Sequence, residues 1–136
     1  MDAYGHLPMK IGRLSELTGL SVDTLRYYEK IGLIDPPFRK GGQRLYDPDA
    51  LRWIDFLKAL KATGMSLDDM KRYALMRARG NATAGNRRVM LEQQHALVLA
   101  RMAELNACAT LLEYKIANYH EIEAGHELAD KKGHAK

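Results

Sequence analysis

The sequence predicts a mainly α-helical protein in which a small N-terminal domain is followed by one long helix. Three observations lead to this prediction. Short amphipathic stretches punctuated by glycine fill the first half of the chain, a basic hairpin interrupts them, and a heptad pattern fills the second half. A length of 136 residues suits one compact domain with one extended element.

A flexible, polar extension over residues 1–8 is expected to precede the domain, which begins with two short helices. Apolar residues recur every three positions from Ile11 to Leu17, and Gly19 suits the left-handed conformation that often ends a helix. The hydroxyl of Ser21 can cap the next helix. Two short helices joined by a glycine-containing turn form a helix-turn-helix.

A short hairpin is expected after the second helix, where two consecutive prolines disfavour further helix. The runs Leu33–Ile34 and Arg44–Tyr46 are predicted to be extended, and Gly41–Gly42 provides the turn between them. Arg39 and Lys40, with the arginine of the second run, make this hairpin basic. A basic hairpin after a helix-turn-helix is called a wing.

Two longer helices are expected to complete the domain, which spans residues 9–79. Residues 47–49 read Asp-Pro-Asp and predict a helix start, because aspartate caps a helix and proline fits its first turn. A wide apolar face follows and Gly64 closes it. Ser66 then caps a fourth helix, which stops at a break over residues 78–86.

A single heptad seam runs through residues 84–122, and the polar residues 123–136 are expected to form a flexible tail. Apolar side chains alternate at spacings of four and three over about four heptads. So narrow a seam on so long a helix needs a partner helix, most simply from a second copy of the chain. The expected dimerisation residues are Leu91, Val98, Met102, Leu105, Ala109, Leu112, Ile116 and Tyr119.

The order of these elements is more specific than any one of them: a winged helix-turn-helix DNA-binding domain followed by a long dimerising coiled-coil helix. The stretches MKIGRLSELTGLSVDTLRYYEKIGLI (9–34) and RLYDPDALRWIDFLKALKATGMSLDDMK (44–71) carry the pattern, together with the coil after them. In these stretches the chain resembles the MerR family of bacterial transcription regulators. The resemblance covers about residues 9–122.

The resemblance implies a homodimer that lays its second helix in the major groove of double-stranded promoter DNA. Such a dimer binds between the two promoter elements, bends and untwists the spacer, and so acts on RNA polymerase indirectly through the promoter. Its effector is not indicated by the sequence. The residues expected to contact DNA are Val22, Asp23, Thr24, Arg26, Tyr27, Arg39, Lys40, Arg44, Tyr46, Lys71 and Arg72.

Several of these residues have a second interpretation. Arg26 can bridge two acceptors of a guanine or hold a phosphate. Tyr46 can support the wing or contact a phosphate, and Lys71 and Arg72 can form a second wing or be ordinary surface charges. Tyr28, beside the expected contact residues, is predicted to face the core instead.

Sensing of a metal or an electrophile has little support in the residues. The single cysteine, Cys108, cannot build a thiolate cage, and His120 and His126 lack metal-pair spacing. Residues 53–81 resemble the aldehyde-sensing branch of the family, whose third helix carries a reactive cysteine, but Ala59 stands at that position here. Cys108 remains the possible redox residue, at a position flanking the seam where partial burial is expected.

Two other functional classes fit the sequence less well than a regulator. An architectural or excisionase-like DNA-binding protein would share the winged part, but the coil and the promoter logic favour a regulator. An enzyme is not predicted, because the sequence has neither a nucleophile–base pair nor a phosphate loop, and no cofactor is expected. The net charge of +4 suits an anionic partner. Apolar runs are far shorter than the ~20 residues that span a bilayer, so a cytoplasmic protein is expected.

Overall fold

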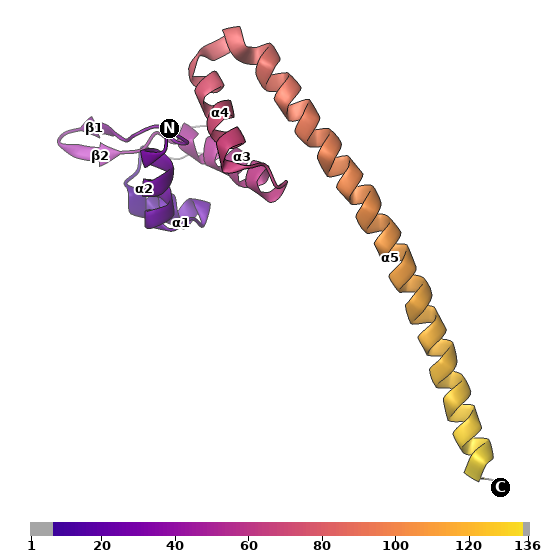
Figure 1. Cartoon of the computed structure of the whole chain (residues 1–136). Helices are drawn as coiled ribbons and strands as arrows, with labels where there is room; N and C mark the ends of the chain where they lie inside the picture. The colour runs from indigo at the N-terminus through magenta and orange to yellow at the C-terminus, as the bar shows by residue number, and fades with distance from the viewer. Residues whose placement is uncertain (1–6, 135–136) are drawn as a thin grey trace. The chain divides into compact units, whose positions relative to one another are not determined.

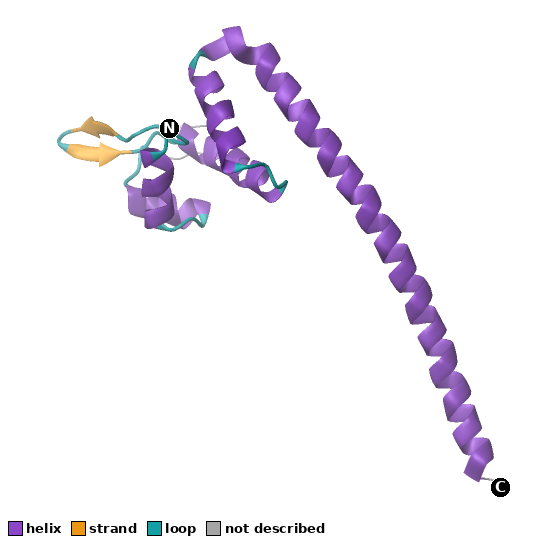
Figure 2. Ribbon diagram, viewed as in Figure 1, coloured by secondary structure: helices purple, strands orange, loops and turns teal. Residues whose placement is uncertain are grey.

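The computed structural model describes residues 7–134, with side chains described up to residue 126 (Figures 1 and 2). The elements in chain order are α1 (Ile11–Thr18), α2 (Val22–Lys30), β1 (Phe38–Lys40), β2 (Gln43–Leu45), α3 (Asp49–Ala62), α4 (Leu67–Ala78), the 3-10 helix η1 (Gly80–Thr83) and α5 (Ala84–His134). The chain divides into two units, one ending at Gln94 and one beginning at His95. The predicted fold class, a helical protein with a helix-turn-helix, a wing and a long C-terminal helix, is confirmed.

The turn between α1 and α2 is closed by the two residues that the sequence singled out. Gly19 has a φ of 74°, which side chains with a Cβ rarely adopt, and its N–H donates to the carbonyl oxygen of Ser15 at 2.9 Å. The Ser21 hydroxyl oxygen accepts from the N–H of Thr24 at 3.1 Å and so caps α2. Lys58 of α3 donates to the carbonyl oxygen of Thr18 at 2.6 Å, which ties this turn to the third helix.

The wing is the antiparallel pair β1–β2, in which Arg39 lies opposite Arg44. The prediction that Leu33–Ile34 forms the first strand is wrong. Both residues are buried in the core, and the Leu33 N–H donates to the carbonyl oxygen of Tyr28 at 2.8 Å, closing the end of α2. Burying two large apolar side chains in the core stabilises the folded chain more than leaving them exposed in a hairpin. The first strand therefore forms after the prolines.

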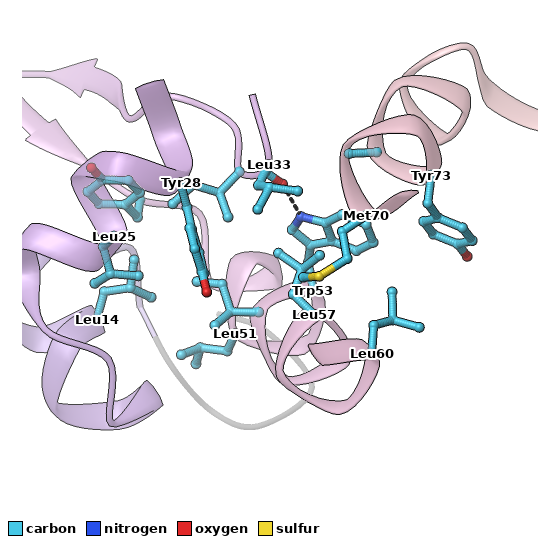
Figure 3. Packing of buried hydrophobic residues seen from close by; sticks show 14 of the residues in the cluster. Leu14, Leu25, Tyr28, Leu33, Leu51, Trp53, Leu57, Leu60, Met70 and Tyr73 are labelled. Carbon is cyan, nitrogen blue, oxygen red and sulfur yellow. Dashed lines mark hydrogen bonds between the residues drawn. The ribbon is translucent and has the colours of Figure 1, made fainter. Parts of the chain in front are cut away.

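Helices α1 to α4 enclose one core (Figure 3). Its deepest side chains come from all four helices and from the loop after α2, and they are Leu14, Leu25, Leu33, Ile54, Leu57 and Met70. Trp53 of α3 donates its indole N–H to the carbonyl oxygen of Leu33 at 2.7 Å, and its ring stacks on Tyr73 of α4. Tyr28 is 6% exposed, so its predicted place in the core is confirmed.

The starts of α3 and α4 follow the predicted capping chemistry. The Asp47 carboxylate accepts from the N–H of Asp49 at 2.8 Å, and the Ser66 hydroxyl oxygen accepts from the N–H of Asp69 at 3.1 Å. Gly64, with a φ of 90°, reverses the chain between the two helices.

The start of α5 is attached to the domain by two sets of hydrogen bonds. The buried Thr83 hydroxyl donates to the carbonyl oxygen of Met76 at 2.5 Å and accepts from Arg87 at 3.1 Å. Further along, the Gln94 amide donates to the Thr63 hydroxyl at 2.9 Å. These bonds connect α5 to the end of α4 and to the α3–α4 turn.

Helix α5 extends farther than the sequence indicated. The polar segment from residue 123, predicted to be a tail, is helical as far as His134. Gly125 and Gly133 each cost a helix about 1 kcal/mol, which neighbouring glutamate, alanine and lysine residues can offset. Residues 1–6 of the predicted extension and residues 135–136 lie outside the described part of the chain. Within the described part, every helix is too short or too polar to cross a membrane.

Candidate nucleic-acid interface

The exposed face of α2 carries a stripe of four side chains at the spacing of successive helical turns. Asp23, Arg26, Tyr27 and Lys30 are all exposed, with 49% of Tyr27 accessible. Leu25 and Tyr28 are buried on the opposite face of α2. The buried face fixes the helix on the domain, so the polar stripe is presented outward on a rigid support.

Two other predicted residues of α2 are less accessible. Val22 and Thr24 are half-buried. The Thr24 hydroxyl oxygen accepts from the Ser21 hydroxyl at 2.9 Å, so part of its hydrogen-bonding capacity is used at the start of the helix. The structure therefore places these two at the edge of the exposed stripe.

The tip of the wing is exposed and basic. Arg39 and Lys40 both face solvent, next to the two glycines of the turn. Arg44 keeps 59% of its side chain exposed, while its Nη2 lies 3.3 Å from Glu29 Oε1 on α2. One nitrogen of the guanidinium is thus directed to α2, and the fork retains other donors for a second acceptor.

Tyr46 holds the base of the wing. Only 5% of the residue is exposed, and its hydroxyl donates to Glu29 Oε2 at 2.8 Å. Burial, followed by the hydrogen bond and charge of Glu29, raises the pKa of Tyr46 to about 12. The phenol stays protonated and remains a donor. Of the two roles considered for this residue, the geometry matches support of the wing.

A groove of about 790 Å³ lies where the start of α1, α2 and the wing meet. Four cationic residues line it: Lys10, Arg26, Lys30 and Arg44. Lys10 and Lys30 are not among the residues predicted to contact DNA. Lys30 could have been found, because it follows Arg26 by four residues on the same helical face. Lys10 had no such signal, since only the packing of α1 brings it beside α2.

Lys71 and Arg72 lie on α4 and are not among the residues that line this groove. Lys71 is half-buried, and Arg72 is exposed and pairs with Asp69 at 3.1 Å. An exposed pair of this kind contributes about 0–1 kcal/mol to stability, so it leaves Arg72 able to exchange its partner.

Most of the seam of α5 is uncovered in the single chain, but Leu91 at its start is half-buried and packs against the core of the domain. Of the predicted seam residues, Met102, Leu105, Leu112, Ile116 and Tyr119 each expose more than half of their surface, from 53% to 63%. Cys108 is exposed as well. Its predicted partial burial depends on a second copy and stays a prediction.

Comparison with known proteins agrees with this arrangement. The profile described as MerR HTH family regulatory protein matches residues 9–76, and a second, described as MerR, DNA binding, matches residues 51–114. An uncharacterized HTH-type transcriptional regulator of Haemophilus influenzae is 40% identical over 114 residues, which cover 82% of this chain and 84% of that protein.

Two solved structures are similar along most of the chain. The crystal structure of HiNmlR, a MerR family regulator lacking the sensor domain and bound to promoter DNA, aligns with a TM-score of 0.76 and 37% identity. The alignment covers 87% of this chain and 94% of that one. A protein from Listeria monocytogenes assigned to the same family aligns with a TM-score of 0.82 and 34% identity, over 94% of this chain and 99% of that one. The chain is therefore a member of the MerR family of DNA-binding transcriptional regulators.

Proposed function

We propose that the chain acts as a homodimer that recognises two half-sites in promoter DNA and remodels the spacer between the promoter elements. In this proposal α2 enters the major groove, the wing holds the flanking backbone, and RNA polymerase responds to the changed DNA rather than to a direct contact. The protein then works in the cytoplasm, where the chromosome lies.

The observation that carries this proposal is the joint exposure of the α2 stripe and the basic groove beside it. The stripe offers Arg26 and Tyr27 to base edges or phosphates, and the groove adds Lys10, Lys30 and Arg44. A major groove about 12 Å wide admits one helix, while phosphates on either side attract the surrounding cations. In the same reading Arg39 and Lys40 reach phosphates from the tip of the wing.

Dimerisation is supported by the uncovered seam of α5. In the heptad register that places Met102 and Ala109 at a, Leu105 and Leu112 occupy successive d positions and expose 59% and 63% of their surface. Apolar side chains repeated at heptad spacing bury this surface when a second helix interdigitates with them. A twofold dimer supplies two recognition helices, which suits a palindromic site.

DNA selection followed by footprinting tests the proposal. The chain is incubated with a random duplex library, and the bound duplexes are recovered and sequenced. A natural promoter that contains the enriched site is then footprinted with the protein. We expect a palindromic site between the promoter elements. Transcription from a promoter whose spacer is shortened by two base pairs should then no longer depend on the protein.

Two results would contradict the proposal. Binding without sequence enrichment would favour an architectural protein. If the enriched site had no fixed position relative to the promoter elements, sequence-specific DNA binding would stand but action through the spacer would be excluded.

A further inference from the structure

A carboxylate lies among the cations of the groove. Glu29 follows Arg26 by three residues on α2 and lines the same groove as Lys10, Lys30 and Arg44. Its side chain is 19% exposed. A negative charge at this place repels DNA phosphates, so it opposes the binding that its neighbours favour.

Glu29 also forms the polar link between α2 and the wing. Its two carboxylate oxygens are used separately: Oε2 accepts from the Tyr46 hydroxyl at 2.8 Å, and Oε1 accepts from Arg44 Nη2 at 3.3 Å. Tyr46 is itself fixed to the start of the domain by two backbone hydrogen bonds with Met9, of 2.7 and 3.1 Å. The orientation of Arg44 relative to α2 therefore depends on Glu29.

We propose that Glu29 is a specificity-determining residue, which positions Arg44 on DNA that fits both α2 and the wing and repels phosphates on DNA that does not. The inference rests on the proposed function, because it requires the groove to face DNA. On a matched site, Arg44 keeps one nitrogen on Glu29 and offers the rest of its fork to a phosphate, and this attraction outweighs the repulsion between the carboxylate and the backbone. On an unmatched site the fork does not reach a phosphate, so the repulsion by the carboxylate is not offset.

The test compares binding to two duplexes by two variants, each of which lacks one negative charge at a different position. The duplexes are a site selected from a random library by the wild-type protein and a scrambled duplex of the same base composition. Glu29→Gln keeps the shape and an acceptor for Tyr46 but removes the charge. We expect its affinity for the scrambled duplex to rise about 1.4- to fivefold, which corresponds to the energies typical of exposed charge pairs. We expect its affinity for the selected duplex to fall or stay unchanged.

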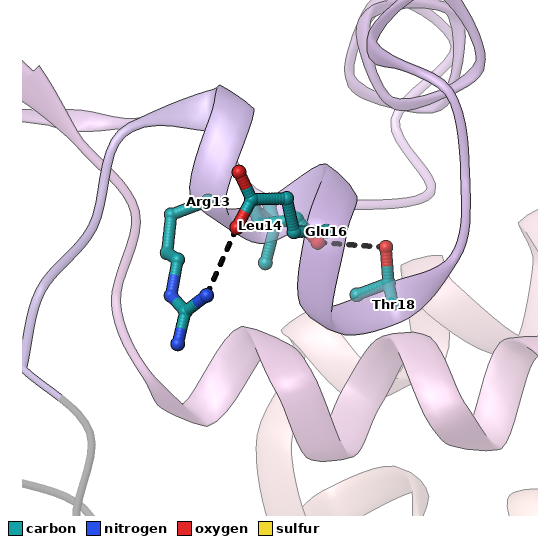
Figure 4. A network of polar contacts seen from close by, with 4 residues as sticks. All are labelled: Arg13, Leu14, Glu16 and Thr18. Atoms are coloured by element: carbon teal, nitrogen blue, oxygen red, sulfur yellow. Dashed lines mark hydrogen bonds and ion pairs between the residues drawn. The ribbon is translucent and has the colours of Figure 1, made fainter.

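Glu16→Gln is the matched control. Glu16 lies on α1, is 69% exposed, pairs with Arg13 at 2.9 Å and does not line the groove (Figure 4). Removing this charge should shift the affinities for both duplexes by the same small factor. Salt titrations of both variants show whether a change arises from phosphate contacts.

Tyr46→Phe tests the positioning step separately, because it removes the hydroxyl link and keeps the carboxylate. It should lower affinity for the selected duplex and leave the scrambled duplex unchanged. Thermal melting establishes that each variant is folded, and the result for Tyr46→Phe stands even if Glu29→Gln melts at too low a temperature to be assayed.

Two patterns would overturn the inference. If Glu29→Gln shifted both duplexes equally, as Glu16→Gln should, the residue would be an ordinary surface charge. If Glu29→Gln and Tyr46→Phe each lowered the affinity for both duplexes by the same factor, the hydrogen bonds of Glu29 would only hold the fold together. Failure of the wild-type protein to enrich any duplex would instead overturn the proposed function, and this inference with it.

Discussion

Arg26 and Arg44 line the same groove but stand in different settings. Arg26 projects from the exposed face of α2, whereas Arg44 extends from the wing and is held by Glu29. A side chain on a helix inside the major groove can reach base edges, while a wing beside it meets the backbone. Substitution of the two arginines should therefore affect DNA binding in different ways.

Arg26→Ala should weaken binding to the selected site by about 1–3 kcal/mol and relax the preference at one base position per half-site. Arg44→Ala should lower the slope of log affinity against log salt by about one and leave base preferences unchanged. Both are measured by anisotropy titrations on a set of singly substituted sites. An altered base preference in Arg44→Ala, with an unchanged salt slope, would show that the wing reads sequence.

Cys108 is exposed in the single chain and is the one cysteine of the sequence. A disulfide would require the same residue of a second copy, with Cα atoms closer than about 7 Å. If the two helices run antiparallel about a centre near Met102–Leu105, the two thiols are too far apart. In a dimer Cys108 also flanks the seam, and the partial burial expected there slows alkylation of the thiol. Cys108→Ser should therefore retain DNA binding and any promoter response to an electrophile. A reporter response that is present in the wild type and absent in Cys108→Ser would identify the thiol as the sensor.

At the scale of elements, Trp53 connects three parts of the domain. It belongs to α3, stacks on Tyr73 of α4 at a centroid distance of 6.0 Å, and donates to Leu33 in the loop after α2. The guanidinium carbon of Arg77, an exposed residue of α4, lies 4.0 Å from the centroid of the Trp53 ring. The loop that leads from α2 to the wing is thus fixed to α3 and, through the stacked rings, to α4.

Trp53→Phe leaves the buried carbonyl oxygen of Leu33 without its donor, and we expect it to lower the free energy of unfolding by about 1–3 kcal/mol. Urea unfolding followed by circular dichroism measures this change. Tyr73→Phe is the control, because it retains the ring that stacks on Trp53, and it should change stability by less than about 0.5 kcal/mol. Equal losses in the two variants would mean that the hydrogen bond to Leu33 contributes little.

At the scale of the whole molecule, the domain and the seam of α5 differ in how far one chain buries their apolar side chains. The core is complete within one chain, since residues such as Leu14, Leu25 and Ile54 are fully buried. The seam is not, and its exposed apolar surface is stabilised only when another helix covers it. We expect folding of the domain and assembly of the dimer to be separable by mutation.

Leu105→Asp should produce a folded monomer that has lost tight binding to the two-site operator, because a charge in the interface costs several kcal/mol. Sedimentation velocity and anisotropy measure the two effects. Ala107→Asp adds the same charge at an f position, on the opposite face of α5, and should leave the dimer intact. A dimeric Leu105→Asp protein would show that another surface holds the two copies together.

The sequence by itself determined the elements whose cause is local. Gly19, Ser21, Asp47 and Ser66 mark helix ends through their own backbone preferences and side-chain hydrogen bonds, and the structure has each as predicted. Helical spacing also separated the buried Tyr28 from the exposed Tyr27. The heptad pattern identified the long helix, although good helix formers carried it past the residue where the pattern weakened.

Only the tertiary structure decided what depends on residues far apart in the chain. The pair Leu33–Ile34 looks extended in isolation, but both side chains are buried in the core and the Leu33 carbonyl oxygen accepts from Trp53, so the first strand forms later, at Phe38–Lys40. The groove could not be read from local pattern, because Lys10 and Arg44 are brought to α2 by folding alone. The pairing of Glu29 with Arg44 and Tyr46 spans 15 and 17 residues. Periodicity carries no information on such contacts, since their partners are chosen by packing rather than by sequence spacing.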